Sequence, residues 1–102
     1  MDKRRKADDL ARQMALRDQF KRDILARKLS IQDAVKTMRR ISRLTQPEFA
    51  RHRGVSLPTL RQIEAGTGNH SVETLNKICS VFGLQVGFIP EIKDRKSDTE
   101  KP

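Results

Sequence analysis

The sequence is poor in the residues that most often carry disulfide, metal or catalytic chemistry. Its 102 residues include one cysteine and two histidines, with no tryptophan and no tyrosine. Cys79 cannot form a disulfide within the chain, and its place on an apolar helical face favours a buried core thiol. His52 and His70 lie far apart and lack the cysteine partners of a zinc site. No nucleophile with an obvious base is recognisable, so we expect no metal, no cofactor and no enzymatic activity.

Long apolar runs are missing as well. No stretch approaches the length that spans a bilayer, and no apolar segment follows the N-terminal lysines and arginines as it would in a signal peptide. We therefore expect a cytoplasmic protein without a membrane partner. A chain of this length makes one domain with an extension, and its modest core would benefit from dimerisation.

Positive charge is abundant and unevenly distributed. The formal net charge is +9 and the isoelectric point is near 10.5. Residues 1–44 hold 14 lysines and arginines against 6 aspartates, a net +8, whereas residues 45–102 hold 8 against 7 acidic residues, a net +1. This balance indicates an anionic partner, nucleic acid before membrane. The alternative for the first thirty residues is a solvated helix face without a partner.

We divide the first part of the chain, residues 1–29, into a basic arm and an amphipathic helix. The arm, residues 1–6, either follows a phosphate backbone or is disordered. Residues 7–28 contain no glycine or proline, and their apolar side chains repeat at i+4. The repeating residues are Leu10, Met14, Leu16, Phe20 and Ile24. Their stripe must pack on its own domain, a second protomer or another protein, and we favour the protein's own dimer.

Residues 30–83 have the pattern of a compact helical domain. Ser30 can begin its first helix with Asp33 as an acidic capping partner. The inward residues predicted for that helix are Ile31, Val35, Met38 and Ile41. Ser71 can begin its last helix, which ends at Gly83. The inward residues predicted there are Val72, Leu75, Ile78, Cys79 and Phe82.

Two short helices joined by a tight turn are predicted between these, over residues 44–66. Thr45 can cap the first helix and Glu48 can complete a capping box, while Pro47 sits where a missing N–H costs nothing. Phe49 and Ala50 face inward, and Gly54 can take the positive φ that the turn needs.

Ser56 can cap the second of these helices, which ends at Gly66 and buries Leu60 and Ile63 at i and i+3. Its outward residues include Arg61 and Gln62, whose side chains suit the edges of bases. This arrangement predicts a helix-turn-helix, in which the second helix enters the DNA major groove. The alternative is a pair of amphipathic helices from some other bundle.

A strand and a tail are predicted after the helical domain. Residues 84–90 alternate, with Leu84, Val86 and Phe88 on one side and Pro90 at the end. Because a lone strand leaves its backbone groups unsatisfied, we expect antiparallel pairing with the same strand of a second copy. Leu84, Val86, Phe88 and Ile89 are the predicted dimerisation residues. The charged residues 91–102 are predicted to be disordered.

A joint pattern within this domain carries a family resemblance. It consists of Leu44-Thr45-Gln46, Phe49-Ala50, Gly54-Val55-Ser56, Thr59-Leu60 and Ile63-Glu64-x-Gly66. The pattern resembles the Cro/cI (Xre) family of DNA-binding domains over roughly residues 31–84. Where that family often has glycine before the Leu-Thr-Gln run, this chain has Arg43, so the turn needs a less favourable φ or a different bend. The resemblance also implies that Arg39 pairs with Glu64.

The same resemblance implies a set of DNA contacts. The base-reading positions are matched by Ser56, Leu57, Pro58, Arg61 and Gln62, with Thr59 beside them. Leu57 and Pro58 cannot hydrogen-bond a base edge, so they are expected to meet thymine methyl groups or sugar. Gln46 matches a phosphate-binding side chain, and Arg53, Asn69 and His70 are further phosphate candidates.

The expected fold is therefore all-α. It is a four- to five-helix Cro/cI-like helix-turn-helix domain with an N-terminal helical extension and one short C-terminal strand that pairs across a dimer. The terminal strand is most similar to that of HipB-like antitoxins and operon regulators. This implies a homodimeric repressor on an inverted-repeat operator, which regulates its own operon and partners a toxin. The alternatives are a protein-interaction adaptor and a non-specific architectural nucleic-acid binder.

Overall fold

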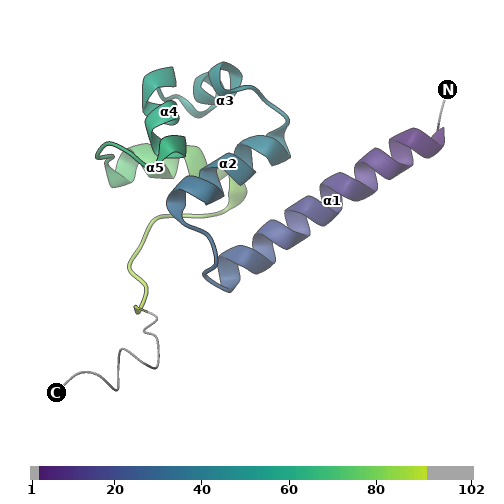
Figure 1. The fold of residues 1–102 in the computed structure, drawn as a ribbon, viewed down its shortest axis with the longest axis horizontal. Helices are drawn as coiled ribbons and strands as arrows, with labels where there is room; N and C mark the ends of the chain where they lie inside the picture. The colour runs from purple at the N-terminus through teal and green to yellow at the C-terminus, as the bar shows by residue number, and fades with distance from the viewer. Residues whose placement is uncertain (1–2, 92–102) are drawn as a thin grey trace.

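The computed structural model of the chain describes residues 3–91, and this part is all-helical (Figure 1). Its helices are α1 (Lys3–Leu25), α2 (Ile31–Ser42), α3 (Gln46–Arg53), α4 (Leu57–Ala65) and α5 (Val72–Cys79), followed by the 3₁₀ turn η1 (Ser80–Phe82). Helices α2 to α5 pack into one compact body, from which α1 projects (Figure 1). Within residues 3–91, no helix is long and apolar enough to cross a membrane. The predicted tail lies, apart from Glu91, outside the described residues.

Hydroxyl side chains begin four of the five helices, as the sequence predicts. Ser30, Thr45, Ser56 and Ser71 each accept a hydrogen bond from the backbone N–H three residues later. Glu48 returns the contact by accepting the backbone N–H of Thr45 at 2.9 Å, which completes the predicted capping box. These caps satisfy N–H groups that a helix leaves without partners at its first turn.

Left-handed residues end α2, α3 and α4, whereas α5 ends at Cys79 and Gly83, which was predicted to end it, follows the 3₁₀ turn η1. Gly54 and Gly66, at φ +73° and +75°, end α3 and α4 as predicted. Arg43 ends α2 at φ +58°, so the turn before α3 does adopt the less favourable φ. An added Cβ at Gly66 would also meet the end of the flexible Gln32 side chain at the start of α2, which would have to move.

One hydrophobic core joins all five helices. Its buried members are Phe20, Ala34, Val35, Met38, Ile41, Phe49, Ala50, Leu60, Ile63, Ile78 and Cys79. Burial of Cys79 is confirmed, and it raises the pKa of the thiol. The prediction that Ile31 and Val72 face inward was wrong, because these side chains are 54% and 56% exposed. Each is the first residue of its helix, and the core contact is made by side chains further along that helix.

Helix α1 is longer at its start and shorter at its end than predicted. It begins at Lys3 instead of near Ala7, so residues 3–6 are helical and not a separate arm. It stops at Leu25 instead of Lys28, because Arg27 adopts a left-handed φ of +58°. Good helix formers at the start and the absence of any breaker account for the extension.

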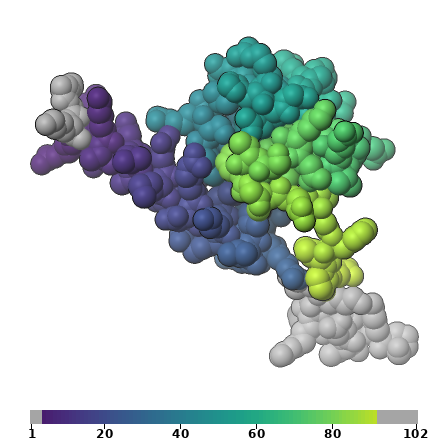
Figure 2. Space-filling view, turned by 180° about the vertical axis from the view of Figure 1, so that it is seen from behind, coloured from purple at the N-terminus to yellow at the C-terminus, as the bar shows by residue number. Residues whose placement is uncertain are grey.

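Only the second half of α1 is anchored in the core. Phe20 is 6% exposed and meets Phe82 of η1 edge to face, with 6.1 Å between ring centroids. Leu16 and Ile24 pack beside it. Leu10 and Met14 are more than half exposed, and the first half of α1 stands away from the body (Figure 2). The stripe was predicted to pack on its own domain, on a second protomer or on another protein. Its second half packs on its own domain, and its first half is exposed.

A buried ion pair fixes α4 on α2. The Arg39 guanidinium donates through Nε to Glu64 Oε2 at 2.8 Å and through Nη2 to Glu64 Oε1 at 3.0 Å. Gln46, the first residue of α3, donates to Glu64 Oε1 at 2.9 Å. Burial alone would raise the pKa of Glu64, but the hydrogen bonds from Arg39 and Gln46 outweigh it and the pKa is lowered. The expected pairing of Arg39 with Glu64 is present, and the contact from α3 extends it.

We predict that Glu64→Gln lowers the free energy of unfolding by roughly 1–3 kcal/mol near pH 7, because charge-assisted hydrogen bonds are lost. The native pKa of Glu64 lies below the unfolded one, so the unfolded chain binds this proton first as the pH falls. The stabilisation is therefore present above the ordinary glutamate pKa, about 4.3, and is lost below it. Urea unfolding followed by circular dichroism should show the difference between the wild type and the variant shrinking as the pH falls below about 4. A difference that stays constant over this range contradicts the assignment.

The docking of α1 leads to a second prediction. Phe20→Ala should lower the free energy of unfolding by about 3 kcal/mol, since it leaves a cavity beside Phe82. Leu10→Ala is the matched control on the exposed half of the same helix, and it should change the value by less than about 0.5 kcal/mol. Equal effects of the two substitutions would mean that α1 is not anchored through Phe20.

Candidate nucleic-acid interface

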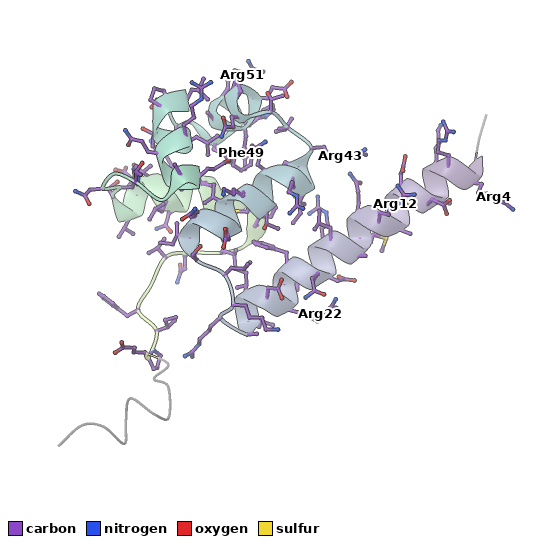
Figure 3. The ribbon with its side chains drawn as sticks, in the orientation of Figure 1. Arg4, Arg12, Arg22, Arg43, Phe49 and Arg51 are labelled. Atoms are coloured by element: carbon purple, nitrogen blue, oxygen red, sulfur yellow. The ribbon has the colours of Figure 1, made fainter. Side chains whose placement is uncertain are left out.

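Helices α3 and α4 and the turn between them form a compact corner. The backbone N–H of Gly54 donates to carbonyls in the last turn of α3, and Val55 N–H donates to Ala50 O at 3.0 Å. Ser56 then caps α4. The buried Phe49 points into the interior from α3, as Figure 3 shows. This is the geometry of a helix-turn-helix, with α4 as its second helix.

Helix α4 has one buried face and one exposed face. Leu60, Ile63 and Glu64 are buried, with Leu60 fully so. Pro58, Arg61 and Gln62 are exposed, and Leu57 and Thr59 are half-buried. The predicted base-reading side chains therefore share the outer side of one helix, which the Glu64 ion pair holds against the body.

The hydroxyl groups at the start of α4 are already engaged with each other. Ser56 Oγ accepts the N–H of Thr59 at 3.2 Å and donates to Thr59 Oγ1 at 2.8 Å. Ser56 therefore works as a helix cap, and its hydroxyl group is also hydrogen-bonded to that of Thr59.

Gln46 supports Glu64 inside the domain, a contact that was not predicted from the sequence, and it is also a predicted phosphate contact. One amide N–H of Gln46 is held by Glu64, as described above, which leaves the second N–H and the side-chain carbonyl for another partner. This hydrogen bond holds the Gln46 side chain at the N-terminus of α3. Its predicted contact with phosphate is compatible with this arrangement, since helix N-termini favour anions.

The loop of residues 67–70 packs against the C-terminal end of α4. Thr67 N–H donates to Gln62 O at 2.9 Å, and His70 Nε2 lies 2.9 Å from Thr67 O. A Cβ on Gly68, which has φ +80°, would come within 2.7 Å of Gln62 Oε1 and 3.1 Å of His70 Nε2. Gln62 and His70 are thus brought together around Gly68, and Asn69 is exposed beside them.

Arg53 lies apart from these residues. Its guanidinium stacks over the Phe49 ring at 5.7 Å, and the side chain lines a groove with residues of α1 and η1. Within residues 3–91, its buried Nε has no hydrogen-bond partner. The structure therefore does not bring Arg53 together with the other predicted DNA contacts.

Two arginines that the sequence reading did not select flank α3. Arg43 and Arg51 are exposed, one in the turn before α3 and the other on its outer side (Figure 3). No signal in the sequence separates them from the other 20 lysines and arginines of the chain. Their exposure and their neighbourhood to α3 add them to the phosphate candidates.

Comparison with known proteins agrees with this geometry. A family model described as a helix-turn-helix domain matches residues 33–87, which include all of α3, α4 and α5 and most of α2. No significant match was found among curated proteins or among solved structures. The matched segment covers more than half of the chain and contains both the predicted motif and the ion pair that supports it. The chain therefore belongs to the helix-turn-helix domain family, and residues 33–87 form a helix-turn-helix DNA-binding domain.

Proposed function

We propose that this protein is a sequence-specific transcriptional repressor that binds an inverted-repeat operator as a homodimer. The observation that carries the proposal is the outer face of α4, where Arg61 and Gln62 are exposed while Glu64 locks the same helix onto α2 and α3. Specific readout needs such a combination, because base contacts demand a side chain held in one position.

The side chains on α4 suggest how bases are read. Arg61 has the planar guanidinium that donates two hydrogen bonds to guanine O6 and N7. Gln62 can form two hydrogen bonds with adenine, because its side-chain N–H donates to N7 and its side-chain carbonyl accepts from the N6 amino group. Pro58 is exposed and apolar, so it suits a thymine methyl group. Leu57 is half-buried and contributes less outer surface.

Backbone phosphates are contacted by a second group of residues in this proposal. Gln46 approaches from the start of α3, and Asn69 and His70 approach from the loop after α4. Arg43, in the turn before α3, and Arg51, on α3 itself, add two positive charges. Such contacts set the position of α4 in the groove and make binding sensitive to salt.

The segment 84–90 supports the homodimer through the direction of its backbone groups. Leu84 N–H donates to Cys79 O at 3.3 Å and Val86 N–H donates to Asn76 Oδ1 at 2.8 Å, so both turn toward the protein's own body. The structure has no strand at residues 84–90. In a paired strand, neighbouring residues direct their N–H groups to opposite sides. Once the segment pairs as a strand, Gln85 and Gly87 therefore offer their N–H groups to an antiparallel partner.

We set the two-fold axis of this pairing at Val86. That register places Leu84 opposite Phe88 of the other copy and Val86 opposite itself, so all three apolar side chains face apolar partners. It also makes Gln85 and Gly87 a hydrogen-bonded pair, which uses the free edge. A two-fold dimer of this kind binds half-sites about one helical turn, or a multiple, apart. Regulation of its own operon and pairing with a toxin are expectations taken from the HipB-like resemblance.

Two other functions are tested by the same assay. A gel shift on DNA fragments selected from the source genome, with random DNA as competitor, separates three outcomes. A repressor retains one site, an architectural protein is fully competed, and an adaptor gives no shift. Sequencing the retained fragments then identifies the operator and shows whether it contains an inverted repeat.

Arg61→Ala should weaken binding to the operator by roughly 1–3 kcal/mol and relax the preference at one base pair, because a bidentate contact to guanine is lost. Binding to random DNA should change little. Arg22→Ala is the matched control, since it removes an arginine from α1, away from α4 (Figure 3). Equal losses on operator and random DNA would show that Arg61 contacts phosphate.

The strand register predicts the outcome of cysteine cross-linking. Val86→Cys should form disulfide-linked dimers under mild oxidation, because residues opposite each other in a non-hydrogen-bonded pair have Cα atoms about 4.5 Å apart. Ile89→Cys is the control, because residue 89 does not meet itself in this register. Non-reducing electrophoresis measures both variants. Cross-linking of neither variant, or equal cross-linking of both, contradicts the register.

A further inference from the structure

A groove of about 750 Å³ runs between the anchored half of α1 and the body of the domain. Its apolar lining includes Met14, Ile24, Ile41, Val81, Phe82 and Leu84. Arg17, Lys21 and Arg53 lie among these residues. The helix-turn-helix corner described above does not use this groove, apart from Arg53.

Apolar side chains that the monomer leaves in solvent gather at this groove and next to it. Val81 is 61% exposed and Leu25 is 79% exposed, and both line the groove. Leu10 lies one turn beyond Met14 along α1. Phe88 and Ile89, which follow Leu84 in the chain, are fully and 66% exposed. Apolar side chains that gather in this way on a surface mark an interaction site more often than scattered single ones do.

We propose that the groove is covered by a second copy of the chain, whose Phe88 enters it beside Leu84 and Val81. This inference rests on the homodimer of the proposed function and adds a docking site to it. The contact is reciprocal, since each protomer carries both the groove and the segment that fills it. Two identical contacts related by a two-fold axis result, as in other isologous dimers.

The pairing register delivers Phe88 to this location. With the axis at Val86, Phe88 lies directly opposite Leu84 of the other protomer, on the same face of the paired strands. Leu84 already lines the groove of its own protomer. The incoming phenyl ring therefore reaches the apolar lining without any rearrangement of the helices.

The size of the interface supports the same conclusion. Two short paired strands are marginally stable in water unless one of their faces packs on an apolar surface. A stable interface buries about 800 Å² on each partner, which seven-residue strands alone do not supply. The groove is the apolar surface that adjoins the segment, and Leu84 belongs to both.

Charge substitution at the groove tests the proposal. Val81→Asp should raise the dimer dissociation constant by roughly tenfold or more, because a carboxylate then faces the partner's Phe88. Val72→Asp is the matched control, because Val72 is a similarly exposed valine on α5. Sedimentation of the full chain over a range of concentrations gives the dissociation constants. Circular dichroism establishes that both variants keep their helices.

A second substitution tests direct contact. Phe88→Lys should weaken the wild-type dimer but strengthen the Val81→Asp dimer, since the lysine meets the introduced carboxylate. Additive losses from the two substitutions, or a dimer that Val81→Asp leaves intact, overturn the inference. The gel shift on the retained operator reports separately on the proposed function. If the protein is a dimer that binds its operator and Val81→Asp leaves this dimer intact, only the groove contact is contradicted. If the wild type shows no specific DNA binding, the proposed function is contradicted.

Discussion

The position of α4 depends on one buried carboxylate. Glu64 of α4 accepts hydrogen bonds from Arg39 of α2 and from Gln46 of α3, so three helices meet at its two oxygen atoms. A buried ion pair adds little net stability, because desolvation offsets most of the attraction. Removing one partner is costly, however, because the other charge is then stranded. The ion pair therefore chiefly sets the orientation of α4 relative to α2 and α3, because the Glu64 carboxylate keeps its hydrogen bonds to Arg39 and Gln46 only in this arrangement.

This constraint links the core of the domain to its outer surface. Arg61 lies three residues before Glu64, so the residue that would read a base and the residue that anchors the helix occupy neighbouring turns of α4. Gln46 extends the link, because the same side chain that supports Glu64 stands at the N-terminus of α3, where a phosphate would approach. Movement of DNA-facing groups relative to the core is thereby limited. Readout by fixed hydrogen bonds depends on such support from the surrounding residues.

Features that depend on short-range chemistry could be predicted from the sequence. The caps at Ser30, Thr45, Ser56 and Ser71 follow from residues within one helical turn, and all are present. The left-handed φ of Arg43 is one of the two alternatives that the family resemblance left open. Ile31 and Val72 were misplaced because both match the apolar periodicity, although the predicted caps at Ser30 and Ser71 already make each of them the first residue of its helix, ahead of the side chains that contact the core. The groove was missed because it follows from the docking of Phe20 against Phe82, a contact between distant parts of the chain. The stacking of Arg53 on Phe49 was also missed, although the two residues lie four apart on α3. Strand pairing of 84–90 is a prediction that a single chain leaves untested.

The exposed apolar groove beside α1 and the segment 84–90 lie in the same region of the fold. Leu84 and Val86 direct their N–H groups inward, which ties the segment to the end of α5 and turns its other edge to solvent. Phe20 fastens α1 beside the same region and leaves an apolar groove open next to it. A 102-residue chain buries a smaller fraction of its surface than a larger domain, so surface left exposed here weighs heavily in its stability. Association through this region would cover the groove and the free edge in one step, on a part of the fold separate from the outer face of α4. Dimer formation and base reading could then coexist without competing for the same residues.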